Sequence, residues 1–247
     1  MAIDEKAQNK AGWLVPPELR LQLLAVLSQD PQRAATMTYD EFLEWANEDT
    51  LAEWVDGKVV MASPASLKHQ MLVRFVMRVL SEFADTFDLS LVLEAPFQMK
   101  LSRSGREPDV LFVAKGHLDR FQDTRLDDPA DLAVEVISPE SGARDRGEKF
   151  YEYEAAGIPE YWLLDPEAER AEFYQLDEHG KYQQIAPDTQ HVYHSRALPG
   201  FWLKTDWLWR EPLPRVTVTL RAIAGDAFVR DQMQQLSEDT SLLDDAT

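Results

Sequence analysis

A chain of 247 residues, 45% of them hydrophobic and none of them cysteine, can bury a sizeable core but excludes a disulfide framework or a thiolate metal site. The formal net charge of −19 argues against a broad nucleic-acid-binding surface, because such surfaces are normally basic. It leaves a local basic cleft, or phosphate binding through a metal ion, open. No apolar run approaches the roughly 20 residues that span a bilayer, and the N-terminal residues lack the apolar stretch of a signal peptide. We therefore expect a cytoplasmic protein with no membrane partner.

The N-terminal part of the chain is predicted to hold two helices. Residues 1–12 are small and polar without periodicity, which is typical of disorder. Pro16-Pro17 opens an amphipathic segment with leucines near helical spacing. Thr38, followed three residues later by Glu41, predicts a capping box at the start of the second helix.

The next stretch combines strands with the longest predicted helix. Asp56-Gly57 is a turn signal, and residues 58–62 are predicted as a strand after it. A wide apolar stripe predicts a helix over about 66–86. Residues 90–101 follow as one long strand or two, broken near Pro96.

A strand with a carboxylate at its start is predicted between two loops. Residues 102–106 read as a polar, locally basic loop, and 114–130 as a loop of mixed charge. Between them, residues 108–113 predict a strand that begins with Asp109.

The run from Asp131 to Ser138 organises the rest of the chain. It is continuously apolar apart from Glu135, which predicts a strand covered on both faces. Because side chains alternate along a strand, Glu135 shares a face with Ala133 and Ile137. A carboxylate there is costly unless a cation or hydrogen-bond donors meet it, so the chain must provide a partner.

This strand is predicted to begin a βαβ unit. A helix is predicted over about 145–156, ended by Gly157 and Pro159, and a strand over 160–165. Strand, helix and strand at this spacing predict that the two strands are parallel.

The C-terminal part is predicted as further strands and a tail. Residues 169–185 predict a hairpin that turns at Glu178-His179-Gly180. Aromatic strand material is expected over 201–203 and 207–209, and a further strand over 216–220. The last ten or so residues are acidic and predicted to be a solvated tail.

Asp109, Glu135 and Lys149 form the constellation with the clearest chemistry. If the strands of Asp109 and Glu135 are neighbours, the two carboxylates can converge, and a divalent cation would remove their repulsion. Oxygen ligands without cysteine indicate Mg²⁺ or Mn²⁺ rather than zinc. Lys149 lies one turn into the helix after the Glu135 strand, and a lysine there can orient or deprotonate a metal-bound water.

These residues resemble a known group. The order of Pro108-Asp109, Glu135-Val136-Ile137 and a downstream lysine is similar to the PD-(D/E)xK nuclease superfamily, and within it to the restriction-endonuclease-like family called Uma-two. The resemblance covers about residues 36–205. It is carried by Glu53-Trp-Val-Asp-Gly57, Ser63-Pro64 with His69-Gln70, Glu107-Pro-Asp-Val110, Val134-Glu-Val-Ile-Ser-Pro139, Asp145-Arg-Gly-Glu-Lys149, Tyr153 and Ala156-Gly-Ile-Pro-Glu-Tyr-Trp-Leu-Leu-Asp-Pro166.

One position departs from the superfamily pattern. The superfamily's lysine usually stands two residues after the acid, where this chain has Ile137. The resemblance implies that the lysine has migrated to Lys149 on the helix, from which it would reach back to the metal-bound water.

The resemblance implies an α/β fold with a restriction-endonuclease-like core: a mixed central sheet, flanking helices and a central βαβ crossover. It also implies metal-dependent hydrolysis of phosphodiester bonds, with DNA as the first expectation. Asp109, Glu135 and the main-chain carbonyl of Val136 would hold Mg²⁺ or Mn²⁺, and Lys149 would position the attacking water. Glu53 and His69 are additional candidates for this site.

Three segments are expected along the chain. Residues 1–36 are an N-terminal extension with a helix, 37–210 the PD-(D/E)xK nuclease-like domain, and 211–247 a C-terminal extension with an acidic tail. The expected partner is nucleic acid, and monomer and homodimer both stay open.

The three central residues also have structural interpretations. Glu135 could be a buried carboxylate paired with an arginine. Asp109 could simply terminate a strand. Lys149 could form surface salt bridges with Asp145 and Glu152, which lie four residues before it and three after it.

The remaining candidate site residues also have structural interpretations. Glu53 could be structural, and His69, near a helix start, could be a surface or capping residue. Arg144 and Arg146 could contact phosphate or could simply be solvated.

Two rival functions remain. One is a nuclease-like domain without cleavage activity that acts as a binding or assembly module, which the acidity and Ile137 favour. The other is a metal-dependent hydrolase of a small phosphate ester, since an acidic surface repels DNA.

Overall fold

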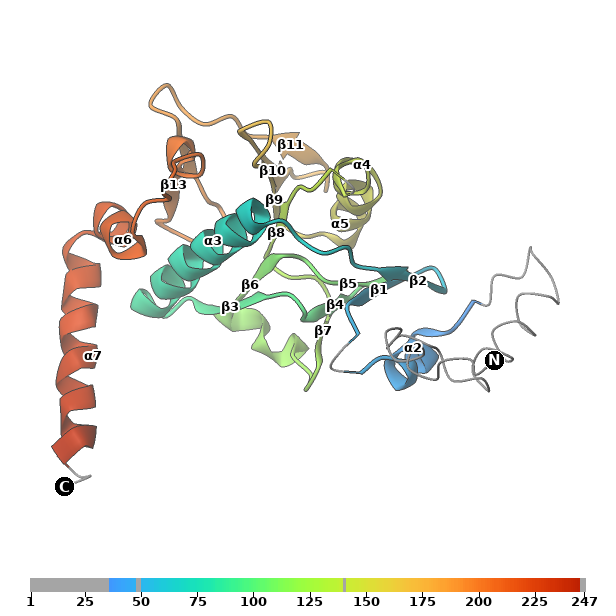
Figure 1. The fold of residues 1–247 in the computed structure, drawn as a ribbon, viewed down its shortest axis with the longest axis horizontal. Coiled ribbons are helices and arrows are strands. Elements are labelled where there is room, and N and C mark those ends of the chain that lie inside the picture. Colours follow the sequence, from blue (N-terminus) through green and yellow to red (C-terminus); the bar gives the residue numbers. More distant parts are fainter. Residues whose placement is uncertain (1–35, 48–49, 140, 245–247) are drawn as a thin grey trace, which may run out of the picture.

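The computed structural model describes residues 36–47, 50–139 and 141–244 (Figure 1). The disorder predicted over 1–12 and the helix predicted after Pro16-Pro17 lie outside the described residues. The described chain forms a six-stranded and a five-stranded sheet with helices around them. The expected α/β class with a mixed sheet and flanking helices is confirmed.

The six-stranded sheet contains the strand that carries Glu135. Its central pair, β8 and β9, is parallel, and all other neighbours in this sheet are antiparallel. Every residue of β8 is buried, as its continuous apolar run predicted. The strand order is β11 (Tyr182–Gln184), β10 (Arg170–Leu176), β9 (Glu160–Asp165), β8 (Leu132–Val136), β6 (Val110–Ala114) and β3 (Ser90–Glu94).

The crossover from β8 to β9 contains three consecutive helical pieces. It consists of α4 (Gly142–Arg144), a π-helical turn (Asp145–Lys149) and α5 (Phe150–Ala156). The helix ends at Gly157, whose φ of 84° is the left-handed conformation that glycine adopts without a steric penalty. The βαβ unit with parallel strands is confirmed, but its helix starts earlier than predicted and is interrupted by the π turn.

The two faces of β8 pack against different partners. Leu132, Val134 and Val136 belong to the core that α3 (Leu67–Thr86) covers. Ala133 and Ile137 point to the other face, where α5 and the five-stranded sheet complete a second core. Glu135 therefore lies on the side of α5, as strand alternation predicted.

The five-stranded sheet holds three strands that the sequence did not predict: β1, β5 and β7. The last two lie in segments predicted as loops; β5 pairs with both β1 and β4 and is buried throughout. The Asp56-Gly57 turn between β1 and β2 is confirmed, with positive φ at both residues. The strand order is β2 (Lys58–Met61), β1 (Ala52–Val55), β5 (Ser104–Arg106), β4 (Gln98–Lys100) and β7 (Arg125–Asp127).

The break predicted near Pro96 moves the chain from one sheet to the other. Residues before it form β3 of the six-stranded sheet, and residues after it form β4 of the five-stranded sheet. The region predicted as a loop over 114–130 contains a 3₁₀ helix, η2 (Lys115–Arg120), as well as β7.

The C-terminal part differs most from its prediction. The segment 216–220, predicted as a strand, begins α6 (Val216–Ala224), because Val216 and Leu220, one turn apart, both pack into the core with α3. Residues 207–209 are not a strand either, since a 3₁₀ helix, η4 (Thr205–Trp207), leads into a turn there. A two-stranded sheet of β12 (Val192–His194) and β13 (Trp202–Lys204) precedes it.

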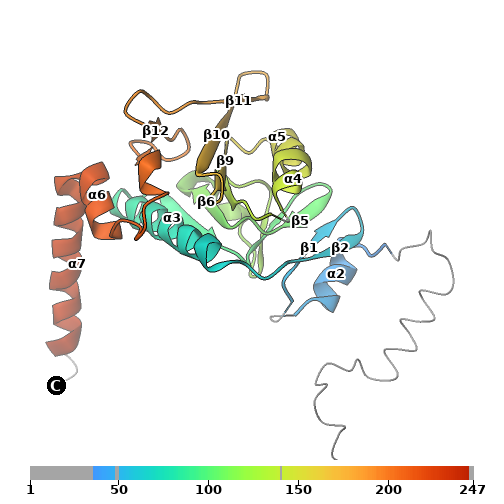
Figure 2. The same cartoon turned by 45° about the horizontal axis from the view of Figure 1, so that its top comes forward.

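Two helices mark opposite ends of the molecule (Figures 1 and 2). The first, α2 (Tyr39–Trp45), starts at the predicted capping box of Thr38 and Glu41. The last, α7 (Asp226–Asp244), extends away from the sheets. None of the helices in the described part of the chain has the length and apolarity needed to cross a membrane.

Candidate active site

A cleft of about 520 Å³ opens at the carboxyl end of β8. It lies where the two sheets, the start of α3 and the π turn meet, which is where open α/β sheets place ligands. All six residues predicted for the site line it, together with two acids that the sequence did not single out. The eight are Glu53, His69, Glu107, Asp109, Glu135, Val136, Asp145 and Lys149.

Asp109 is fixed against the end of β8. It directly precedes β6, which pairs with β8, and its Oδ2 accepts a hydrogen bond of 2.7 Å from the amide of Val136. The interpretation of Asp109 as a strand-terminating residue is thus partly correct, because its carboxylate joins two strands. It also faces the cleft, so this contact holds it in place there.

His69 lies beside Asp109. Its Nε2 is 3.4 Å from Asp109 Oδ2, and the side chain is buried in the first turn of α3. Burial lowers the pKa of His69, but the Asp109 carboxylate and the backbone of Val136 outweigh this and leave the pKa above its usual value. The alternative of a surface or capping histidine is wrong.

Glu135 is buried and paired with a cation. Its Oε1 accepts hydrogen bonds from Lys149 Nζ at 2.8 Å and from the Tyr153 hydroxyl at 2.9 Å. The partner is a lysine, so the alternative of an arginine partner is wrong. Burial raises the pKa of Glu135 to about 8, because the nearby carboxylates act in the same direction and Lys149 offsets only part of the effect.

Lys149 is enclosed by carboxylates. Its Nζ lies 2.8 Å from Glu135, 3.0 Å from Glu53 and 3.9 Å from Asp145. Burial lowers its pKa, but these three acids outweigh burial and hold the pKa above its usual value. The side chain is only 4% exposed, so the alternative of a surface salt bridge is wrong.

The π turn brings two side chains of one helical segment into the cleft. Asp145 and Lys149 stand at its two ends, and both are buried. A π turn adds one residue to a helical turn and is found mostly at functional sites. The sequence pattern predicted an ordinary helix here.

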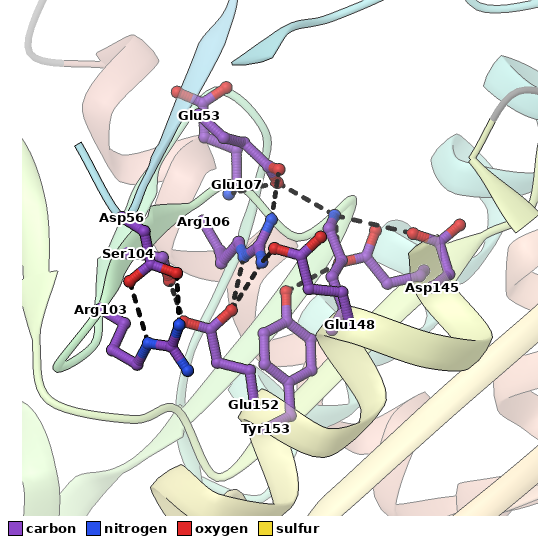
Figure 3. A network of polar contacts seen from close by, with 12 residues as sticks. Glu53, Asp56, Arg103, Ser104, Arg106, Glu107, Asp145, Glu148, Glu152 and Tyr153 are labelled. Carbon is purple, nitrogen blue, oxygen red and sulfur yellow. Dashed lines mark hydrogen bonds and ion pairs between the residues drawn. The ribbon is translucent and has the colours of Figure 1, made fainter. Parts of the chain in front are cut away.

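Arg106 holds the outer side of the site together. It is fully buried and pairs with Glu53 at 3.1 Å, Glu148 at 2.7 Å and Glu152 at 2.6 Å (Figure 3). Burial raises the pKa of Glu53, but Lys149 and Arg106 outweigh it and lower this pKa to about 2. The acids spaced four residues apart on one helix face were a signal for such a partner.

Asp145 and Glu107 are the acids that sequence reasoning missed. Asp145 is 1% exposed, and neither of its carboxylate oxygens has a hydrogen-bond partner among the described residues. The sequence predicts Asp145 only as a surface partner of Lys149. Burial raises the pKa of Glu107 to about 7, and Glu53 acts in the same direction.

The side chains are not arranged as a closed metal cage. Within the part of the chain that the structure describes, no three histidine, aspartate or glutamate side chains surround one point as ligands would. Lys149 instead occupies the space among three of the acids.

Comparisons with known proteins agree with the fold. The family model Uma2, described as “Putative restriction endonuclease”, matches residues 39–206. A crystal structure of a “putative nuclease belonging to DUF820” from Anabaena variabilis is similar, with a TM-score of 0.60 and 15% sequence identity. The match covers 70% of this chain and 97% of that one, and at this identity it shows the fold alone. No curated protein matches the sequence.

Proposed function

The chain belongs to the Uma2 family, and from that premise we propose that it is a metal-dependent endonuclease that hydrolyses phosphodiester bonds in DNA. The observation that carries this proposal is the excess of carboxylates in the cleft. Glu53, Glu135 and Asp145 surround one buried ammonium, and Asp109 lines the same cleft. Burial, together with these neighbouring carboxylates, raises the pKa of Glu135. A divalent cation would relieve this excess of negative charge.

The donors suit Mg²⁺ or Mn²⁺. Mg²⁺ keeps several waters and is commonly held by one or two carboxylates, so Asp109 and Glu135 can suffice without a closed cage. The carbonyl of Val136 lies on the same strand edge as its amide, which already contacts Asp109. The carboxylate oxygens of Asp145, which have no hydrogen-bond partner among the described residues, are further acceptors in the same cleft.

The residues that line the cleft would have different roles in the reaction. A bound cation supplies a Lewis acid and lowers the pKa of a water ligand. Lys149, held by Glu135 and Glu53, places a positive charge where it can orient the attacking water and stabilise charge on the phosphate. His69 and the Val136 amide keep Asp109 in position.

An activity screen tests this function. Duplex DNA, single-stranded DNA, RNA and a small phosphodiester are incubated with the protein, with Mg²⁺ or with EDTA. We expect duplex DNA to be cut only with Mg²⁺. Cleavage that persists in EDTA would refute the metal dependence, and hydrolysis of the small ester alone would refute the DNA substrate.

One observation favours a second function, a nuclease-like binding module without cleavage activity. Lys149 Nζ is already engaged by Glu135 and Glu53, and Ile137 occupies the superfamily's usual lysine position. A protein that bound DNA in the screen but cut no substrate under any metal condition would support this function.

A further inference from the structure

The cleft has a charge distribution that does not by itself attract a polyanion. Its acids outnumber its cations, and two of the cations are already used. His69 faces Asp109, and Lys149 faces three carboxylates. A phosphate group entering the cleft needs another positive partner.

Arg144 is the exception among the cations that line the cleft. It is half-buried at the end of α4, and its Nε is shielded from solvent without a hydrogen-bond partner among the described residues. Its guanidinium also forms no ion pair with any carboxylate of the residues that the structure describes. Asp145 is adjacent in sequence, and the Arg144 charge acts to lower its pKa, but the two side chains form no ion pair.

The neighbouring arginine behaves differently. Arg146 Nη2 lies 3.0 Å from both Asp165 and Glu172, and its side chain lines a separate hollow outside the cleft. Of the two arginines that could contact phosphate, Arg146 is paired with acids, and Arg144 has no ion-pair partner among the described residues. The unpaired one faces the cleft.

The backbone before Arg144 is held firmly. Ser138 and Ser141 exchange hydrogen bonds, each backbone amide donating to the other's hydroxyl at 3.0 and 3.1 Å. These bonds tie Ser141, three residues before Arg144, to Ser138 at the end of β8. The planar fork of a guanidinium can meet two phosphate oxygens at once.

We propose that Arg144 is the residue that binds the substrate's phosphate, through its non-bridging oxygens, at the mouth of the candidate active site. This role rests on the proposed function, because it takes the ligand to be a nucleic-acid phosphodiester. In this role, Arg144 supplies a positive charge that attracts the DNA phosphate to a chain of net negative charge.

Binding of fluorescein-labelled duplex and single-stranded DNA, followed by anisotropy across a salt series, tests this role. Ca²⁺ replaces Mg²⁺, and gel electrophoresis checks that the probe stays intact. Arg144→Gln should weaken binding about tenfold or more, equally for different sequences. It should also reduce the slope of log affinity against log salt by about one, since one phosphate contact is lost.

Two variants complete the design. Arg144→Lys should keep the salt slope but lose part of the affinity, because an ammonium lacks the fork. Arg74→Gln removes the same charge from an exposed position on α3 that does not line the cleft, and should bind like the wild type.

The outcomes separate this role from the proposed function. If the wild type binds DNA and a folded Arg144→Gln matches its affinity and slope, Arg144 is not the phosphate ligand and the nuclease proposal stands. If the wild type binds neither probe, both proposals fall. If Arg144→Gln does not fold, Arg144→Lys decides: reduced affinity at an unchanged Tm supports the role, and unchanged affinity contradicts it.

Discussion

Among single residues, Lys149 is expected to contribute both to cleavage and to stability, and its substitution should affect both. Lys149→Met should reduce DNA cleavage by about 10²-fold or more if the ammonium serves the attacking water. Lys149→Arg should also cut poorly, because a guanidinium is bulkier than the ammonium that fits among the three carboxylates. Cleavage rates under single-turnover conditions measure both. Wild-type rates in Lys149→Met would show that another group acts on the water.

The same substitution should affect stability. It leaves Glu53, Glu135 and Asp145 without their shared ammonium. Breaking a buried pair in this way costs about 3–5 kcal/mol, so activity must be compared below the lowered Tm. Ile137→Lys in the Lys149→Met background tests whether a lysine at the superfamily's usual position can replace Lys149 in cleavage.

Glu53 predicts how stability depends on acid pH. Its pKa of about 2 in the folded state lies below the ordinary value of 4.5, so its contribution is fully present above pH 4.5. That contribution, about 3 kcal/mol, is lost as pH falls from 4.5 through 2. In Glu53→Gln, denaturant unfolding between these pH values should show a flatter dependence than in the wild type. Parallel profiles would contradict the assignment.

At the scale of elements, the π turn sets the register of the site. Deleting Gly147 should convert it to ordinary helix, with Asp145 and Lys149 three residues apart instead of four, and so change how the two side chains are placed in the cleft. We expect a folded protein that has lost cleavage. Gly147→Ala is the control: a Cβ there meets no atom within 4 Å, so activity should persist with a stability gain of about 0.5–1 kcal/mol. Full activity of the deletion would show that register at this turn is unimportant.

The elements also show what the sequence could predict. The β8–α5–β9 unit was correctly placed because its apolar run, helix stop and second apolar run all agree with one structure. Convergence of Asp109 and Glu135 on one cleft followed from the pairing of neighbouring strands. At the start of α6, Val-Thr-Val-Thr-Leu alternates as a strand would. It forms a helix because Val216 and Leu220 pack into the core with α3, which the local sequence does not show.

The missed site residues have a common physical cause. Arg106 looked like part of a polar loop because its carboxylate partners come from β1 and from the crossover, far away in the sequence. Asp145 looked solvent-exposed because an ordinary helix was expected where the π turn lies. Neither the contact between the sheets nor the π turn has a local sequence signal.

At the scale of the whole molecule, α7 divides into a docked and an extended part. Phe228 is buried in the core, and Asp231 accepts a hydrogen bond from Thr86, whereas Met233 and Leu236 are exposed. Removing residues 236–247 should leave the Tm nearly unchanged. Removing residues from 227 onwards should lower it by several degrees, because Phe228 leaves the core. A matching loss in the shorter truncation would show that the tail is docked.

Thermal unfolding measured against metal concentration tests whether Asp109 and Glu135 share a divalent cation, as proposed above. Millimolar Mg²⁺ or Mn²⁺ should raise the wild-type Tm by mass action, and Asp109→Ala and Glu135→Ala should each abolish that rise. Glu178→Ala, which removes an exposed acid outside the cleft, should retain it. A wild-type Tm that does not respond to either metal, or a rise that survives in both cleft variants, would contradict the account.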